Sequence, residues 1–264
     1  LLHEASIPLS GPAHQPPLHI TMSDFYSLLA HYYDSIFPAE TEIVEFLAAE
    51  LDRGARGGAG ARVIDAACGT GNYTDALAAR GFECLGFDAS AEMIEIAKRS
   101  GKRGRFEVRE LEELGGLGPE AGLFCIGNSL PHLPDRDAVR TFFGDVSRVV
   151  EPGGSVIVQT VNFARFTGTD AEIALPPVER PDIRMERRYR PGSEPGTVVF
   201  HAELSTADGE RAAGDTPLLA LTREDLVDAA RNAGLRDIEL AGSFDGSPYD
   251  ADSSFVMVLT ARNG

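Results

Sequence analysis

Apolar and polar residues follow two different periods along the middle of the chain. From residue 62 to residue 161, short apolar runs recur and alternate with stretches in which apolar residues have helical spacing. The runs cover 62–66, 83–88, 105–108, 123–127 and 155–161, and the pattern predicts helices over 73–80, 90–100 and 136–150. Strands separated by helices in this order predict a parallel sheet with right-handed crossovers.

Both flanks of this region differ from it. Before it, the spacing predicts a helix that starts with Ser23 as N-cap and ends before Pro38, and a second helix over 40–51. After it, two alternating runs at 183–189 and 198–205 are typical of antiparallel strands. A helix over 222–234 and strands over 237–244 and 254–261 complete the pattern, and these last two strands would give the sheet an antiparallel edge.

The expected fold is therefore α/β, with a doubly wound, mostly parallel seven-stranded sheet, a terminal antiparallel hairpin and a small β-rich insertion. Residues 1–21 lack a hydrophobic period and contain four prolines, so we interpret them as a flexible extension. Residues 22–162 would hold the N-terminal helices and the ligand-binding core, and residues 163–217 the insertion. Residues 218–264 would supply the last helix and the last two strands of the core.

Composition excludes several classes of partner. The 264 residues include 41 acidic and 24 basic side chains, which gives a net charge of −17. This balance argues against a nucleic-acid partner, which requires a basic face, and against an anionic membrane surface. No apolar stretch free of charges and breaks is long enough to cross a bilayer, so we expect a soluble protein. Only two of the basic residues are lysines, a bias that a GC-rich genome or adaptation to high salt would explain.

The cysteines point to a reducing compartment. Cys68, Cys84 and Cys125 form neither a CxxC motif nor a Cys/His cluster, so neither a zinc site nor a disulfide framework is expected. We therefore expect no bound metal and a cytoplasmic location.

A glycine-rich turn after the first of the alternating strands is the most informative segment. It reads Asp65-Ala-Ala-Cys-Gly-Thr-Gly71 and lies at the carboxyl edge of the sheet, where α/β proteins bind ligands. Its glycines allow a ligand to approach the backbone closely, and Asp88, at the end of the next strand, can accept both hydroxyls of a ribose. A dinucleotide-binding fold would share these features, but its third glycine would fall at Thr74, and Asp65 suits an amino group better than a pyrophosphate.

In this segment the sequence resembles the class I S-adenosylmethionine-dependent methyltransferases. Residues 65–71 look like motif I of that family and Asp88 like its motif II acid, and the resemblance extends from about residue 24 to the C-terminus. It implies a Rossmann-like fold and S-adenosyl-L-methionine as the cofactor. It also implies that Asp65, Ala67, Gly69 and Gly71 contact the methionine and ribose portions and that Asp88 binds the ribose hydroxyls.

The same resemblance extends the candidate cofactor site along the chain. Glu110 and Leu111 occupy the positions that usually contact adenine, although Asp is the common residue at the first of them. Segment 125–133 resembles motif IV of a small-molecule subgroup that includes glycine N-methyltransferase-like enzymes. The further residues implied are Ala89 and Met93, Asn128 and Ser129 beneath the methyl end, and Tyr26 and Tyr33 closing over the cofactor.

His132 and Tyr33 are the candidates for catalysis. His132 would orient the acceptor or take its proton, although a lone His after a strand is more often structural. One basic cluster interrupts the acidic chain, and it is explained either by solvated strand residues or by a site for an anionic acceptor: Arg184, Arg187, Arg188 and Arg190.

Together these features predict an enzyme that transfers a methyl group from S-adenosylmethionine to the nitrogen or oxygen of a small-molecule acceptor. The reaction is an in-line displacement, in which positioning and exclusion of water contribute most of the catalysis. The insertion would form the acceptor lid. Two alternatives remain at this stage, a non-catalytic module that binds S-adenosylmethionine or a nucleotide, and a methyltransferase that acts on a macromolecule.

Overall fold

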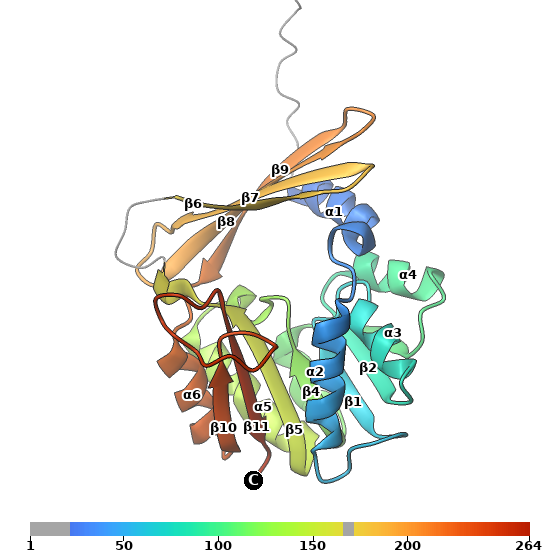
Figure 1. Ribbon diagram of the computed structural model, residues 1–264, viewed down its shortest axis with the longest axis vertical. Helices are drawn as coiled ribbons and strands as arrows, with labels where there is room; N and C mark the ends of the chain where they lie inside the picture. The colour runs from blue at the N-terminus through green and yellow to red at the C-terminus, as the bar shows by residue number, and fades with distance from the viewer. Residues whose placement is uncertain (1–21, 166–171) are drawn as a thin grey trace, which may run out of the picture.

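The computed structural model describes residues 22–165 and 172–264, and the expected extension over 1–21 lies outside them. The strands of the described chain form two sheets (Figure 1). The larger sheet has the strand order β10 (Arg236–Ala241), β11 (Val256–Arg262), β5 (Val150–Val161), β4 (Glu120–Cys125), β1 (Arg62–Ala66), β2 (Glu83–Asp88) and β3 (Arg105–Val108). The smaller sheet has the order β6 (Ile173–Glu179), β7 (Ile183–Pro191), β8 (Thr197–Thr206) and β9 (Arg211–Leu219).

The seven-stranded sheet matches the expected fold class. Strands β1 to β5 pair in parallel, whereas β11 runs antiparallel to both β5 and β10. The helices are α1 (Met22–Ile36), α2 (Thr41–Asp52), α3 (Asn72–Ala78), α4 (Ala91–Arg99), α5 (Arg136–Val149) and α6 (Arg223–Asn232). Short 3₁₀ segments are η1 (Leu111–Gly116), η2 (Leu130–His132) and η3 (Phe163–Arg165).

Helices cover both faces of this sheet. On one face, α5 and α6 pack against alternate strand residues such as Ile64 and Leu123. On the other face, α2 and α3 pack against the residues between them, such as Val63 and Phe124. Because successive strand residues point to opposite faces, strands buried on both sides read as continuous apolar runs, as the sequence shows.

The four-stranded sheet is antiparallel and follows the carboxyl end of β5 in the chain. Figure 1 shows it lying across the end of the seven-stranded sheet. Helix α1 packs on one face of it, where Phe25 and Leu28 join Met185 and Leu204 in one buried apolar cluster. This face of the small sheet, which we call its inner face, also carries Tyr189 in a second cluster with Phe163, directly after β5.

Several elements differ from the sequence-based expectation. Strand β4 begins at Glu120, three residues before the predicted start, and β5 begins at Val150. Ser23 lies within α1 and does not precede it as a cap. Strands β6 and β9 were not predicted, because each contains proline, but both are edge strands, where a missing N–H is tolerated.

No helix in the described chain is both long and apolar enough to cross a membrane.

Candidate functional site

Strand β1 leads the chain into a tight turn at the carboxyl edge of the seven-stranded sheet. Ala67, Gly69 and Gly71 have φ values of 61°, 55° and 79°, a left-handed conformation that few residues with side chains adopt. A Cβ on Gly71 would lie only 2.3 Å from Cε1 of Phe106. A Cβ on Gly69 would lie 3.2 Å from Cε1 of Tyr33, so the Tyr33 ring packs directly against the turn.

Asp88 closes this turn from the end of β2. The Gly69 N–H donates to Oδ2 of Asp88 at 2.8 Å, and the Ser90 N–H donates to Oδ1 at 2.9 Å. Desolvation raises the pKa of Asp88 above its usual value, and the two backbone hydrogen bonds oppose that shift. Each carboxylate oxygen retains an acceptor site, because a carboxylate has about four lone-pair positions. Asp88 is thus fixed beside the turn and able to accept further hydroxyls.

Asp65 lies behind the turn and is almost fully buried. The hydroxyl of Thr74 donates to Oδ2 of Asp65 at 2.6 Å. Burial, which is the largest effect, raises the pKa of Asp65 from 3.8 to about 7, and the hydrogen bond from Thr74 opposes the shift. Thr74 occupies the position of the third glycine in a dinucleotide motif, so its hydroxyl gives that departure a structural reason. A cation near Asp65 would favour the ionised carboxylate.

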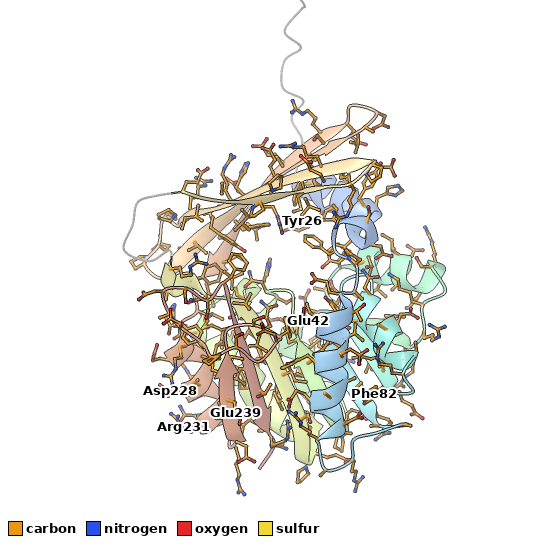
Figure 2. The ribbon with its side chains drawn as sticks, viewed as in Figure 1. Tyr26, Glu42, Phe82, Asp228, Arg231 and Glu239 are labelled. Atoms are coloured by element: carbon orange, nitrogen blue, oxygen red, sulfur yellow. The ribbon has the colours of Figure 1, made fainter. Side chains whose placement is uncertain are left out.

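Tyr33 and Tyr26 have different surroundings, although both belong to α1. Tyr33 packs on the turn and on Phe37, whose ring centroid is 5.1 Å away. Burial and the charges of Asp88 and Asp65 raise the pKa of Tyr33 well above its usual value, so its phenol stays protonated. Tyr26 is 40% exposed, and its hydroxyl forms a hydrogen bond of 2.8 Å with Thr216 on β9. Figure 2 shows Tyr26 at the junction of α1 and the small sheet.

Lys102 fastens α1 to the turn, a role that the sequence did not reveal. Its ammonium group donates to Oδ2 of Asp34 at 2.6 Å, to the Thr70 carbonyl at 2.9 Å and to Oδ1 of Asn72 at 2.7 Å. The Thr70 hydroxyl also donates to Asp34. All three N–H donors of the Lys102 ammonium are therefore used, and its side chain is only 12% exposed. We call these four residues the Lys102 clamp.

The predicted adenine residues lie after β3. Glu110 is exposed and directly precedes η1, and its N–H donates to Oε2 of Glu113 at 3.2 Å. Leu111 is half-buried against the main core. Near the end of β2, Ala89 is exposed, whereas Met93 is buried in the first turn of α4. These residues follow the carboxyl ends of neighbouring strands, as expected for one side of a nucleoside site.

The segment after β4 presents Asn128, Ser129 and His132. Asn128 has a φ of 64°, and its Oδ1 accepts the Val161 N–H at 2.8 Å, which ties this loop to β5. The Ser129 hydroxyl donates to the Ile126 carbonyl at 3.0 Å. His132 is exposed, and nearby protein atoms nevertheless desolvate its ring and lower its pKa, so it is neutral at pH 7.

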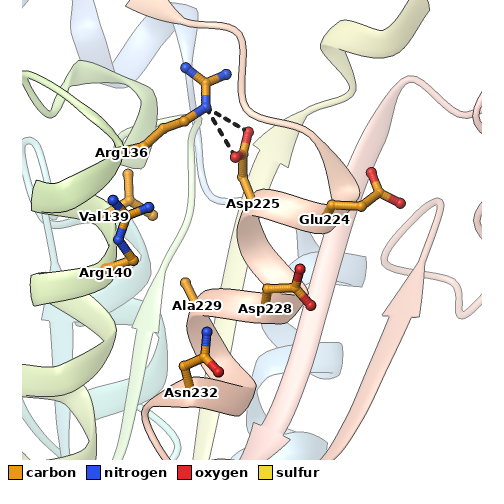
Figure 3. A pocket seen from close by; sticks show the side chains of 8 residues that line it. All are labelled: Arg136, Val139, Arg140, Glu224, Asp225, Asp228, Ala229 and Asn232. Carbon is orange, nitrogen blue, oxygen red and sulfur yellow. Dashed lines mark hydrogen bonds and ion pairs between the residues drawn. The ribbon is translucent and has the colours of Figure 1, made fainter.

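A groove elsewhere on the surface contains none of these residues. It lies between α5 and α6, and Figure 3 shows Asp225 and Asp228 along it. Nε of Arg136 donates to both oxygens of Asp225, at 3.0 and 3.1 Å. The arginine is thus neutralised by an ion pair that links α5 to α6, so we interpret the groove as a structural contact between these helices.

Comparison with known proteins identifies the domain. Residues 63–154, about a third of the chain, match a family model described as a methyltransferase domain. Glycine N-methyltransferase from Mus musculus is 32% identical over 126 residues, which is 41% of this chain and 43% of the relative. Ubiquinone biosynthesis O-methyltransferase from Xanthomonas oryzae pv. oryzae is 26% identical over 167 residues, or 59% of this chain and 64% of the relative.

A solved structure extends the likeness over nearly the whole chain. An S-adenosylmethionine-dependent methyltransferase from Clostridium acetobutylicum superposes with a TM-score of 0.75 at 18% identity, over 91% of this chain and 99% of the other. The chain therefore contains a methyltransferase domain and has the fold of the class I S-adenosylmethionine-dependent methyltransferases, which confirms the prediction from its motifs. An amino pentose methyltransferase from Micromonospora echinaspora, whose solved structure holds S-adenosylmethionine, superposes with a TM-score of 0.65 at 19% identity, over 94% of this chain and 99% of the other. The chain matches less than two thirds of the length of either curated relative.

Proposed function

We propose that the protein transfers the methyl group of S-adenosylmethionine to a nitrogen or oxygen of a small-molecule acceptor. The observation that carries the proposal is the turn over 67–71, whose left-handed backbone leaves no room for a Cβ at Gly71 and which Asp88 and Tyr33 enclose. Such a turn accepts a ligand against its backbone, and a carboxylate fixed beside it suits ribose hydroxyls. The residues present therefore fit the cofactor.

Each cofactor-binding residue has a proposed task. The backbone of Ala67, Gly69 and Gly71 would contact the methionine and ribose portions, and Asp88 would accept the ribose hydroxyls. Asp65 would stabilise the positively charged amino group of the cofactor from behind the turn. Further contacts are proposed for Ala89, Met93, Glu110 and Leu111 around adenine, for Asn128 and Ser129 beneath the methyl end, and for Tyr26 and Tyr33 above.

The acceptor would approach from the side of His132 and Tyr33. The bound cofactor supplies a methyl group that is electrophilic because it is attached to a sulfonium. His132 is neutral at pH 7 and would take the proton that an amine or hydroxyl acceptor loses. Tyr33 keeps its phenolic proton and would act as a hydrogen-bond donor. Residues 163–217, which include the small sheet, would cover the acceptor and exclude water.

Charge and cysteine chemistry support the remaining proposals. The net charge of −17 suits a cationic cofactor and a small acceptor, and it disfavours a nucleic acid. Cys68, Cys84 and Cys125 are free thiols in the structure, which supports a cytoplasmic location.

The test is a methyl-transfer screen with radiolabelled S-adenosylmethionine over amines, amino acids, phenols and carboxylates. The proposal predicts a labelled small product with at least one class, and little label with Asp88→Ala. A purified protein that binds the cofactor but labels nothing, even in a broad cell extract, would instead be a non-catalytic binding module. Label found only on protein or nucleic acid would indicate a macromolecular acceptor.

A further inference from the structure

The basic cluster of β7 divides between the two faces of the small sheet. Residues alternate along the strand, and the buried members are Ile183, Met185 and Tyr189. Arg184, Arg188 and Arg190 alternate with these and lie on the outer face. Arg187 shares the inner face with the buried residues and is itself half-buried.

The outer arginines are neutralised by carboxylates. Arg184 donates to Oε1 of Glu186 at 2.9 Å and Arg188 pairs with Glu172 at 3.0 Å. Arg190 pairs with Asp215 on β9. These three arginines are therefore part of a surface network of ion pairs and are not free to bind a ligand strongly.

Arg187 has no carboxylate partner among the described residues. Its Nη2 donates to the Pro176 carbonyl at 3.2 Å, whereas its Nε is buried and has no hydrogen-bond partner among residues 22–165 and 172–264. Nη1 also makes no hydrogen bond within the described chain, but unlike Nε it remains accessible to solvent. Burial lowers the pKa of Arg187, as expected for a guanidinium without an anion.

The position of Arg187 connects it to the proposed active site. On the inner face it lies between Met185, in the cluster with α1, and Tyr189, in the cluster at the end of β5. Its guanidinium carbon lies 5.8 Å from the centroid of Phe37. Phe37 packs on Tyr33, and Tyr33 packs on Gly69 of the turn. Two aromatic rings thus separate the unpaired cation from the turn that would hold the cofactor.

We propose that Arg187 binds an anionic group of the methyl acceptor, a carboxylate or a phosphate. A guanidinium presents planar pairs of N–H donors that match such groups, and the ring of Phe37 holds it in place by a cation–π contact. A chain with a net charge of −17 repels anions in general, so one uncompensated arginine on the inner face would select for them at this place. The inference deepens the proposed function and rests on it, since it names the class of acceptor.

Binding of anionic probes tests the proposal without an identified acceptor. Benzoate, its neutral isostere benzamide, and phenyl phosphate are titrated calorimetrically into the protein, both free and loaded with S-adenosylhomocysteine. We expect benzoate or phenyl phosphate to bind at least about tenfold more tightly than benzamide, and the tighter of the two identifies the anion. Arg187→Gln should abolish this preference, Arg187→Lys should retain part of it, and the matched control Arg184→Gln should retain all of it.

The outcomes separate this inference from the proposed function. Equal binding of the charged and neutral probes by the wild-type protein, or an unchanged preference in Arg187→Gln, would overturn the role of Arg187. Absence of binding by all three probes would overturn it as well. Failure to bind S-adenosylmethionine would contradict the proposed function, whereas normal cofactor binding without an anion preference would remove only the role of Arg187. Arg187→Gln should bind the cofactor with unchanged affinity, which also shows that the variant is folded.

Discussion

Replacing Asp65 by Asn should change the pH dependence of stability. The pKa of Asp65 is about 7 in the folded protein because the carboxyl group is buried, against 3.8 when it is hydrated. A raised acid pKa means that the folded state binds more protons than the unfolded state between these values. Stability contributed by the protonated form is therefore present at low pH and is lost as the pH rises towards 7.

The size of the effect follows from the two pKa values. One pKa unit corresponds to ~1.4 kcal/mol, so ionisation of Asp65 costs the folded protein ~4 kcal/mol once the pH exceeds 7. Between pH 5 and pH 8 the cost grows by ~3 kcal/mol. Asn does not titrate, and its carbonyl oxygen can still accept the hydrogen bond from Thr74. Its NH₂ group lacks a defined acceptor, which subtracts ~1–3 kcal/mol at every pH.

Urea unfolding followed by circular dichroism, at pH 5, 6, 7 and 8, measures the effect. The free energy of unfolding of Asp65→Asn relative to wild type should rise by ~3 kcal/mol from pH 5 to pH 8. Asp52→Asn, at an exposed position in the last turn of α2, is the matched control and should show no such trend. The reasoning is refuted if the difference between Asp65→Asn and wild type is the same at all four pH values. Asp65→Asn should also bind S-adenosylmethionine about tenfold more weakly, because the carboxylate that is proposed to stabilise the positive charge of the cofactor is lost.

Three further variants test other parts of the site. Lys102→Met should lower the free energy of unfolding by ~1–3 kcal/mol and weaken cofactor binding, because three hydrogen bonds from a charged donor are lost. The control Lys98→Met, on the exposed side of α4, should change neither quantity, and equal effects of the two variants would contradict the role of the Lys102 clamp. Gly71→Ala should lower the free energy of unfolding, measured with urea, by more than about 1 kcal/mol, because the new Cβ would clash with Phe106 and the left-handed φ is strained. An unchanged free energy of unfolding would contradict the described conformation of the turn. His132→Gln should reduce kcat and remove the acidic limb of the pH profile while leaving cofactor affinity unchanged, and an unaltered profile would show that the imidazole takes no proton.

Local sequence patterns were sufficient to predict the seven-stranded sheet. Strands β1, β2 and β3 have the predicted ends. Strands β1 and β2 are buried along nearly their whole length, so their apolar runs coincide with the strands. The start of β4 was missed because Glu120-Ala-Gly122 has low strand propensity, and pairing with β1 and β5 outweighs that propensity. The edge strands β6 and β9 were missed for a related reason, since proline is tolerated there only because a neighbouring strand is absent on one side.

The site shows a similar division between local and long-range information. The turn over 67–71 and Asp88 could be predicted, because motif spacing fixes their place at the ends of adjacent strands. The Lys102 clamp could not, because it joins Lys102 to Asp34, 68 residues away, and neither residue stands out in the sequence. Likewise, the sequence showed four arginines in one cluster but not their partners. The folded structure distinguishes Arg187 from the neutralised members, because it shows that Arg188 and Arg190 have carboxylate partners in other segments of the chain.

Calorimetric titration of the purified protein with S-adenosylmethionine, and separately with NAD, tests the central claim most directly. The account predicts one S-adenosylmethionine site per chain and no measurable binding of NAD. It also predicts at least about a tenfold loss of S-adenosylmethionine affinity in Asp88→Ala, because two backbone N–H groups lose their acceptor and the ribose hydroxyls would lose the one proposed for them. Tight binding of NAD without binding of S-adenosylmethionine would contradict it, as would an unchanged affinity in Asp88→Ala.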